Sequence, residues 1–104
     1  MENKIKVTSW SEGGKGLSGY KIFNHDKLIY ETEVGESTNN IACFLGICHA
    51  IYQFPNEVIY TNNNTALTWC RQRRCNTDSE LLFHRVAKAE RYLRALTQIK
   101  VSKM

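Results

Sequence analysis

The chain has 104 residues, of which 42% are hydrophobic and 23% are charged. This length suffices for one buried core but not for two, and the composition excludes a disordered tail and a fibrous repeat. We therefore predict a single domain over residues 1–104. The longest apolar run, Ile41–Ile47, is far shorter than the roughly 20 residues that cross a bilayer. The first four residues also lack the apolar run of a signal peptide, so we expect a cytoplasmic protein without a membrane partner.

The net charge of +4 is distributed unevenly along the chain. Residues 1–52 carry five Lys and six Asp or Glu, whereas residues 53–104 carry nine Lys or Arg and four acids. The second half is therefore a candidate surface for a polyanion. Solvated helix faces would explain the same charges.

Three antiparallel strands are predicted in the first third of the chain. Lys4–Thr8 alternates apolar and polar residues, as a strand with one buried face does. Ser9–Ser18 holds three glycines and predicts a loop, after which Gly19–Phe23 resumes as a second strand. Asn24–Lys27 forms a tight polar connection to a third strand, Leu28–Val34.

A helix and a fourth strand follow. Gly35–Ser37 breaks the strand pattern, and Thr38 or Asn39 can cap a helix whose apolar residues recur at steps of three and four. Pro55 predicts that this helix ends before it. Glu57–Thr61 is a short strand reached through the helix, so we expect it to run parallel to its neighbour.

Two further helices and a last strand complete the predicted order. Asn62–Asn64 supplies a cap for a helix over Thr65–Arg73. Asn76–Ser79 caps a long amphipathic helix that reaches Leu96, and Ile99–Ser102 is a final strand. The resulting order, βββαβααβ, predicts an α/β fold with a five-stranded mixed sheet and helices mainly on one face.

The four cysteines predict neither disulfides nor a metal site. Without an export signal they are expected to stay reduced. Cys43 and Cys48 are five residues apart, as are Cys70 and Cys75, and this spacing turns the members of each pair about 140° apart on a helix. We expect all four to be small apolar side chains.

Three segments in the same order carry a resemblance to a known family. Ser37–Ala50 resembles the start of the first helix of the ribonuclease H family, and Val58–Ala66 with Trp69 resembles its fourth strand and second helix. Arg85–Leu93 is similar to the long helix of bacterial members. The resemblance covers residues 4–104 and implies a ribonuclease H-like fold in which the family's C-terminal helix is absent.

The same resemblance implies that the catalytic site is degenerate. The family cuts the RNA strand of RNA–DNA hybrids with two Mg²⁺ ions held by four carboxylates. Three of these positions fall on Thr8 (or Ser9, if the register shifts by one), Cys43 and Asn62, and the fourth has no counterpart. Neutral hydroxyl, thiol and amide groups do not replace the charge that holds Mg²⁺, and without metal the attacking water is not activated. Glu12 is the only other acid expected nearby, and one carboxylate does not build a site for two metal ions. We therefore predict no catalytic residue, no metal, no cofactor and no hydrolysis.

A binding function could survive this loss. In the family the turn matched by Thr38, Asn39 and Asn40 contacts the nucleic-acid backbone and minor groove, and helix N-termini offer free N–H groups to phosphates. Asn63 and Asn64 begin the next helix beside the same groove. Plain helix capping is the alternative explanation for these five residues, and it is the more ordinary one.

Two groups of cations could also contact phosphates without reading sequence. The first group ends the second helix and consists of Arg71, Arg73 and Arg74. The second recurs along the third helix and consists of Arg85, Lys88, Arg91 and Arg94. A solvated helix face is the alternative for the second group.

The sequence therefore predicts an inactive ribonuclease H-like protein with residual, weak binding of RNA–DNA hybrid or another nucleic acid. One alternative is a protein-interaction module, for example a homodimer, that has lost both activities. A second alternative is a hybrid ribonuclease that another chain completes.

Overall fold

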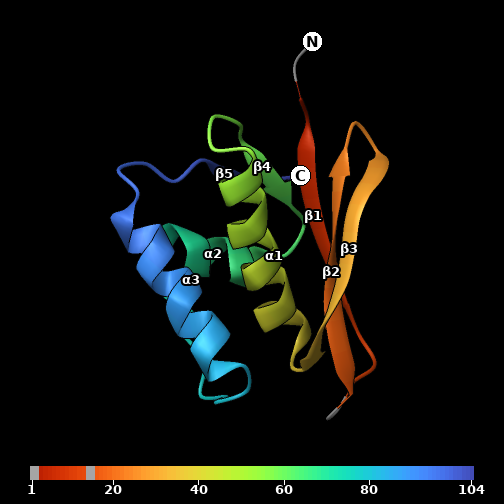
Figure 1. Cartoon of the computed structure of the whole chain (residues 1–104), viewed down its shortest axis with the longest axis vertical. Helices are drawn as coiled ribbons and strands as arrows, with labels where there is room; N and C mark the ends of the chain where they lie inside the picture. The colour runs from red at the N-terminus through yellow and green to blue at the C-terminus, as the bar shows by residue number, and fades with distance from the viewer. Residues whose placement is uncertain (1–2, 14–15) are drawn as a thin grey trace.

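The computed structural model describes residues 3–13 and 16–104; the outermost part of the predicted domain, residues 1–2, and part of the predicted first loop, residues 14–15, lie outside these ranges. The strands are β1 (Ile5–Ser11), β2 (Leu17–Asn24), β3 (Lys27–Glu36), β4 (Ile59–Thr61) and β5 (Val101–Lys103). The helices are α1 (Asn39–Gln53), α2 (Asn64–Gln72) and α3 (Phe83–Ala95). This order confirms the predicted one, and Figure 1 shows the helices gathered on one side of the long strands β1 to β3.

The sheet is mixed, as predicted, with the strand order β3-β2-β1-β4-β5. β1, β2 and β3 form an antiparallel meander, whereas β4 lies parallel to β1, and β5 lies parallel to β4. The crossover through α1 places β4 beside β1, so that β1 occupies the middle of the sheet. Within the described ranges, no helix combines the length and the apolar character that crossing a bilayer requires.

The first two strands are longer than predicted. The expected loop Ser9–Ser18 is wrong at both ends, because β1 continues to Ser11, which pairs with Ser18. Next to this pair, Trp10 lies opposite Gly19. A Cβ atom at residue 19 would lie only 2.5 Å from the Trp10 ring, so glycine is the residue that lets the ring cross β2 there.

The start of α3 also differs from the prediction. The expected cap in Asn76–Ser79 does not form, because the Thr77 hydroxyl accepts a hydrogen bond from the Ser79 N–H and the Ser79 hydroxyl accepts one from the Leu81 N–H, both at 3.2 Å. The N-cap is instead Leu82, in left-handed geometry at φ 58° and without a side-chain cap. Local turns have used the hydroxyls that were expected to begin the helix.

α1 lies at the centre of the core. It packs on β1, β2 and β4 on one side and on α2 and α3 on the other. Ten of its fifteen residues are buried, which is typical of a helix enclosed on several sides. Phe44 is one of the apolar residues that recur along α1 at steps of three and four, and it is completely buried. Its ring meets the Trp69 ring edge-on, with the ring centroids 6.2 Å apart.

Candidate functional site

The carboxyl ends of β1 and β4 meet the first turns of α1 and α2. Val7 is the parallel partner of Thr61, so β1 and β4 end at the same edge of the sheet. The Ser9 hydroxyl donates to Asn39 Oδ1 over 2.7 Å, which joins the end of β1 to the first residue of α1. α2 begins three residues after Thr61. These contacts define one polar site at the strand ends, which we call the strand-end site.

Cys43 is the buried centre of the strand-end site. Its Sγ atom lies 3.3 Å from Thr61 Oγ1, and the side chain is completely inaccessible to solvent. Burial raises the pKa of the Cys43 thiol, while hydrogen bonds with Thr61 and Ser9 oppose this shift without cancelling it. The thiol is therefore neutral at pH 7, and the groups around it are neutral hydroxyls.

Strand alternation decides which residues reach Cys43. Val7 is buried on the α1 side of β1, so Ser9 shares its face and Thr8 points to the opposite face. The register shifted by one residue, with Ser9 in place of Thr8, is the one that gives the contact with Cys43. On β4 the contact comes from Thr61, which the sequence interpretation missed, and the predicted Asn62 is exposed beside it. The signal for Thr61 was its position two residues after the buried Ile59, which puts both side chains on the same face of β4.

Helix α1 begins with a threonine cap and helix α2 begins with an asparagine cap. Thr38 Oγ1 accepts from the Ile41 N–H at 3.1 Å, and Asn63 Oδ1 accepts from the Ala66 N–H at 2.9 Å. Asn63 Nδ2 also donates to Asn40 Oδ1 over 3.0 Å and thereby ties the two helix starts together. Capping thus occupies part of the predicted binding set.

The free ends of both helices still favour an anion. Neither α1 nor α2 has an acidic residue in its first turn, so no carboxylate offsets the positive end of either helix dipole. Asn39 and Asn64 are exposed at these two ends. Paired helix N-termini with exposed amides are suited to phosphate oxygens.

The predicted arginines lie elsewhere. Arg71, in the last turn of α2, donates to the Val101 carbonyl of β5 over 3.3 Å. Arg73 is the C-cap of α2 in left-handed geometry at φ 60°, and Arg74 follows it. A nine-residue helix, about 13 Å long, separates these cations from Asn64. The structure therefore divides the predicted binding set between the two ends of α2.

The donors at the strand-end site do not fit the Mg²⁺ ions that the resemblance implies. Mg²⁺ needs an octahedron of oxygen ligands with carboxylate charge, whereas Ser9, Cys43 and Thr61 offer two hydroxyls and a neutral thiol. The predicted nearby acid, Glu12, is exposed in the loop after β1. Within the described residues, no three His, Cys, Asp or Glu side chains form a group that could hold a metal ion.

The geometry defines a ribonuclease H-like fold, and comparison with solved structures shows the same. LC11 ribonuclease H1, solved in complex with an RNA/DNA hybrid, matches at a TM-score of 0.61 and 15% identity over 99% of this chain and 85% of that chain. Ribonuclease H1 from Halobacterium salinarum matches at a TM-score of 0.57 and 16% identity, over 98% and 84% of the two chains. An N-terminal ribonuclease H domain from Mycobacterium tuberculosis matches at 0.59 and 16%, over 99% and 83%. No protein-family model and no curated protein matches the sequence.

Proposed function

We propose that this chain is a non-catalytic protein with a ribonuclease H-like fold that binds an RNA–DNA hybrid, or another duplex nucleic acid, at the strand-end site. One observation carries the proposal. Where the resemblance puts metal-binding carboxylates, the chain has a neutral, hydrogen-bonded set centred on Cys43, flanked by two helix N-termini without an acid in the first turn. Losing the carboxylates removes hydrolysis and also removes negative charge that would repel a phosphate.

The binding chemistry follows from the two helix starts. Free N–H groups at the first turns of α1 and α2 would donate to phosphate oxygens, and the exposed Asn39 and Asn64 would add amide donors. The contact set is small, and its groups recognise backbone rather than base edges. Binding should therefore be weak and insensitive to sequence, and salt should weaken it only by screening the two helix dipoles. A structural neighbour, LC11 ribonuclease H1, was solved with an RNA/DNA hybrid.

An exposed asparagine gives a clean test of this site. Asn64→Asp adds a negative charge beside the proposed phosphate, while an acid in the first turn of α2 should leave the helix as stable or slightly more stable. We expect the affinity for a labelled hybrid, measured by fluorescence anisotropy, to fall about tenfold. Because the proposed donors are uncharged, raising the salt fourfold should weaken the wild type by much less than the roughly 40-fold that three lysine or arginine contacts to phosphates would give.

Asn56→Asp is the matched control for this experiment. It adds the same charge at an exposed position in the loop after α1, at the other end of that helix, and should leave the affinity unchanged. Equal affinities for the two variants would contradict the proposed site. Absent binding at low salt would instead favour a protein-interaction module, for which the exposed apolar residues of the edge strand β3 are suited: Leu28, Ile29 and Tyr30.

Hydrolysis is tested separately. We expect no cleavage of a labelled hybrid with Mg²⁺ or Mn²⁺ at an enzyme concentration above that of the substrate, because the groups that contact Cys43 hold no charge for a metal. Denaturing gels after prolonged incubation measure the product. Cleavage of one substrate per protein molecule, above a mock purification, would overturn the non-catalytic assignment.

A further inference from the structure

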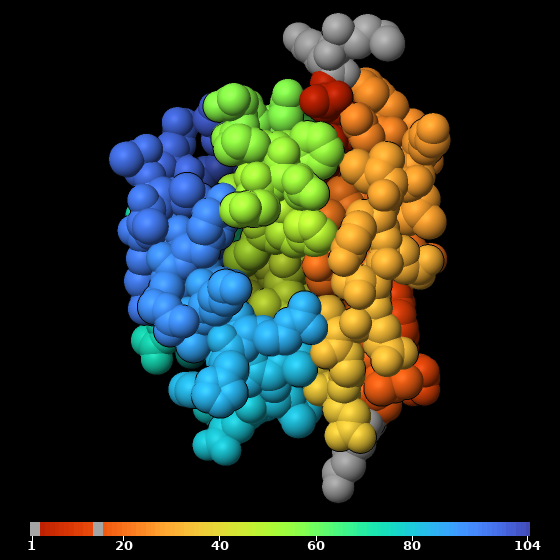
Figure 2. Space-filling view, in the orientation of Figure 1, coloured from red at the N-terminus to blue at the C-terminus, as the bar shows by residue number. Residues whose placement is uncertain are grey.

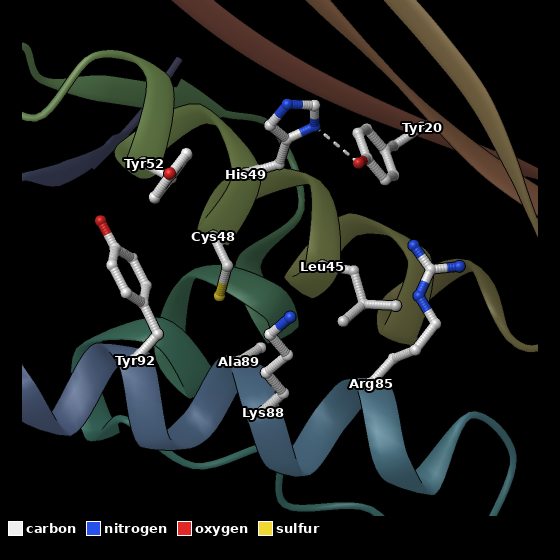
Figure 3. Close-up of a pocket in the computed structure, with 9 residues that line it drawn as sticks. All are labelled: Tyr20, Leu45, Cys48, His49, Tyr52, Arg85, Lys88, Ala89 and Tyr92. Carbon is white, nitrogen blue, oxygen red and sulfur yellow. Dashed lines mark hydrogen bonds between the residues drawn. The ribbon is translucent and has the colours of Figure 1, made fainter.

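A second surface feature lies away from the strand-end site. Figure 2 shows the molecule hollowed over α1, between α3 and β3. The hollow is a cleft of about 590 Å³, a volume within the range of small-molecule sites. Its walls are the middle and C-terminal half of α1, the facing side of α3 and one residue of β2. The residues that line it are Tyr20, Leu45, Cys48, His49, Tyr52, Arg85, Lys88, Ala89 and Tyr92 (Figure 3).

The floor of the cleft is apolar and its two ends are aromatic. Leu45 and Cys48 are buried below it, so a ligand would displace water from an apolar surface. At one end Tyr52 of α1 faces Tyr92 of α3 with the ring centroids 5.9 Å apart (Figure 3). Tyr52 is 70% exposed, although large aromatic side chains usually pack against other residues. This exposed ring is free to stack on a flat ligand.

The other end of the cleft is a satisfied polar pair. The Tyr20 hydroxyl and His49 Nδ1 are 2.7 Å apart, and the Tyr30 ring stands edge-on to His49 at 4.5 Å between centroids. Burial raises the pKa of Tyr20 to about 12 and lowers the pKa of His49. Tyr20 therefore donates and neutral His49 accepts, which places the imidazole proton on Nε2. This end contributes no charge at pH 7.

The charge of the cleft is positive only. Arg85 and Lys88 lie three residues apart on α3 and extend toward α1, as Figure 3 shows. Arg85 Nη1 donates to the Val34 carbonyl at 3.4 Å, and the other N–H groups of the guanidinium remain available to a ligand. Lys88 is exposed and has no hydrogen bond or ion pair with any residue in the described ranges. Among the residues that the structure describes, none that lines the cleft is acidic, so neither cation is paired with a carboxylate of the lining.

We propose that this cleft binds a small anion of the nucleoside monophosphate class, which combines a flat ring with a phosphate. The ring would stack on Tyr52 at the aromatic end, and the phosphate would meet Lys88 and Arg85 across the apolar floor. Two neighbouring cations match a phosphate dianion, and the exposed tyrosine supplies the stacking surface. The inference does not depend on the proposed nucleic-acid function, because no residue of the strand-end site lines the cleft.

Isothermal titration calorimetry of the full chain with adenosine monophosphate tests which parts of the ligand are required. Adenosine supplies the ring without the charge, and ribose 5-phosphate supplies the charge without the ring. We expect each of the two partial ligands to bind at least about tenfold more weakly than the monophosphate. Equal binding of the monophosphate and ribose 5-phosphate would remove the aromatic contribution and overturn the proposal.

Two substitutions locate the binding. Lys88→Ala and Tyr52→Ala each remove an exposed side chain, and each should lower the affinity for adenosine monophosphate about tenfold. Arg91→Ala is the matched control, because Arg91 is exposed on α3 and does not line the cleft, and it should leave the affinity unchanged. Unchanged thermal midpoints would show that the variants are folded. Equal affinities for Lys88→Ala and Arg91→Ala would contradict the assignment.

Amide chemical shifts distinguish the cleft from the strand-end site. Addition of the monophosphate should shift the signals of Cys48, Tyr52 and Lys88 and leave that of Asn64 in place. Shifts confined to Asn64 and the first turn of α1 would overturn the cleft and would leave the proposed nucleic-acid site standing. Shifts confined to the cleft, in a protein that fails to bind a hybrid, would support the cleft alone.

Discussion

Cys43 combines complete burial with two hydroxyl neighbours. The thiol contacts Thr61 and Ser9, and burial outweighs these hydrogen bonds, so its pKa is raised. Cys75 behaves in the same way, since burial and then the Glu90 carboxylate raise its pKa to about 12. Both side chains are therefore neutral in the folded protein at a pH where they would ionise in the unfolded chain.

This difference makes stability depend on alkaline pH. The folded protein retains protons that the unfolded chain releases above the ordinary thiol pKa of 9.0, so unfolding becomes easier as pH rises from there toward the folded pKa, which for Cys75 is about 12. We expect the free energy of unfolding to be constant between pH 7 and 8 and to fall above pH 9, by up to about 1.4 kcal/mol per pH unit for each such thiol. Urea unfolding at several pH values measures this.

Cys75→Ala provides the control for the pH prediction. The variant lacks one titrating thiol and should lose stability less steeply than the wild type between pH 9 and 11. Cys75 is 7% exposed, so the substitution also removes packing and lowers the free energy of unfolding by the same amount at every pH. Parallel pH profiles for the two proteins would show that this thiol does not contribute.

The contact between α1 and β2 depends on a glycine. A Cβ atom at Gly46 would lie 2.7 Å from Cγ of the Tyr20 ring, closer than packed carbon atoms approach. The absence of a side chain lets α1 lie directly on the Tyr20 ring, and three residues further along α1 His49 reaches the Tyr20 hydroxyl. One side of the cleft is thus set by how closely the helix approaches the strand.

Gly46→Ala should therefore destabilise the protein, although glycine-to-alanine substitutions inside helices usually stabilise. In the middle of a helix, glycine to alanine is favourable by about 1 kcal/mol, but here the added methyl group should destabilise the protein by about 1–3 kcal/mol. Chemical denaturation measures the change. Combining Gly46→Ala with Tyr20→Ala removes the ring atoms and leaves only the Tyr20 Cβ atom, 2.9 Å from the added methyl group. The clash is then partly relieved, so the double variant should be more stable than the sum of the single effects predicts. Strict additivity would contradict a direct contact.

The elements differ in how well the sequence predicts them. The order of strands and helices follows from periodicity and turn residues, and the start of α1 follows from Thr38, whose hydroxyl caps it. The start of α3 was mispredicted because Thr77 and Ser79 can form local turns as readily as a cap, and sequence alone does not decide between them.

For the strand-end site the sequence interpretation named Cys43, Asn62 and either Thr8 or Ser9, and the structure brings Ser9 and Thr61 to Cys43. Cys43 was placed by resemblance, but its partners depend on strand register, and a shift of one residue exchanges Thr8 for Ser9. The cleft was not predicted at all. Tyr52 and Tyr92 are 40 residues apart, and only the packing of α3 on α1 brings them together.

At the scale of the whole molecule, α1 connects two separate surfaces. Its first residue, Asn39, accepts from the end of β1, whereas His49 and Tyr52 line the cleft ten or more residues later, about 15 Å along the helix axis. The start of α1, which favours an anion, and the cleft wall formed by His49 and Tyr52 therefore lie on different parts of one buried helix. Each surface can be altered by exposed residues without disturbing the other.

The four cysteines are all free and no more than 7% exposed. They belong to α1, α2 and the loop after α2, which the Cys75 N–H ties to Glu90 of α3 over 2.9 Å. Cys43 and Cys70 are 0% exposed, so an alkylating reagent reaches these two only when the elements separate. The rate at which these two thiols are alkylated under native conditions therefore reports how often the helical layer opens.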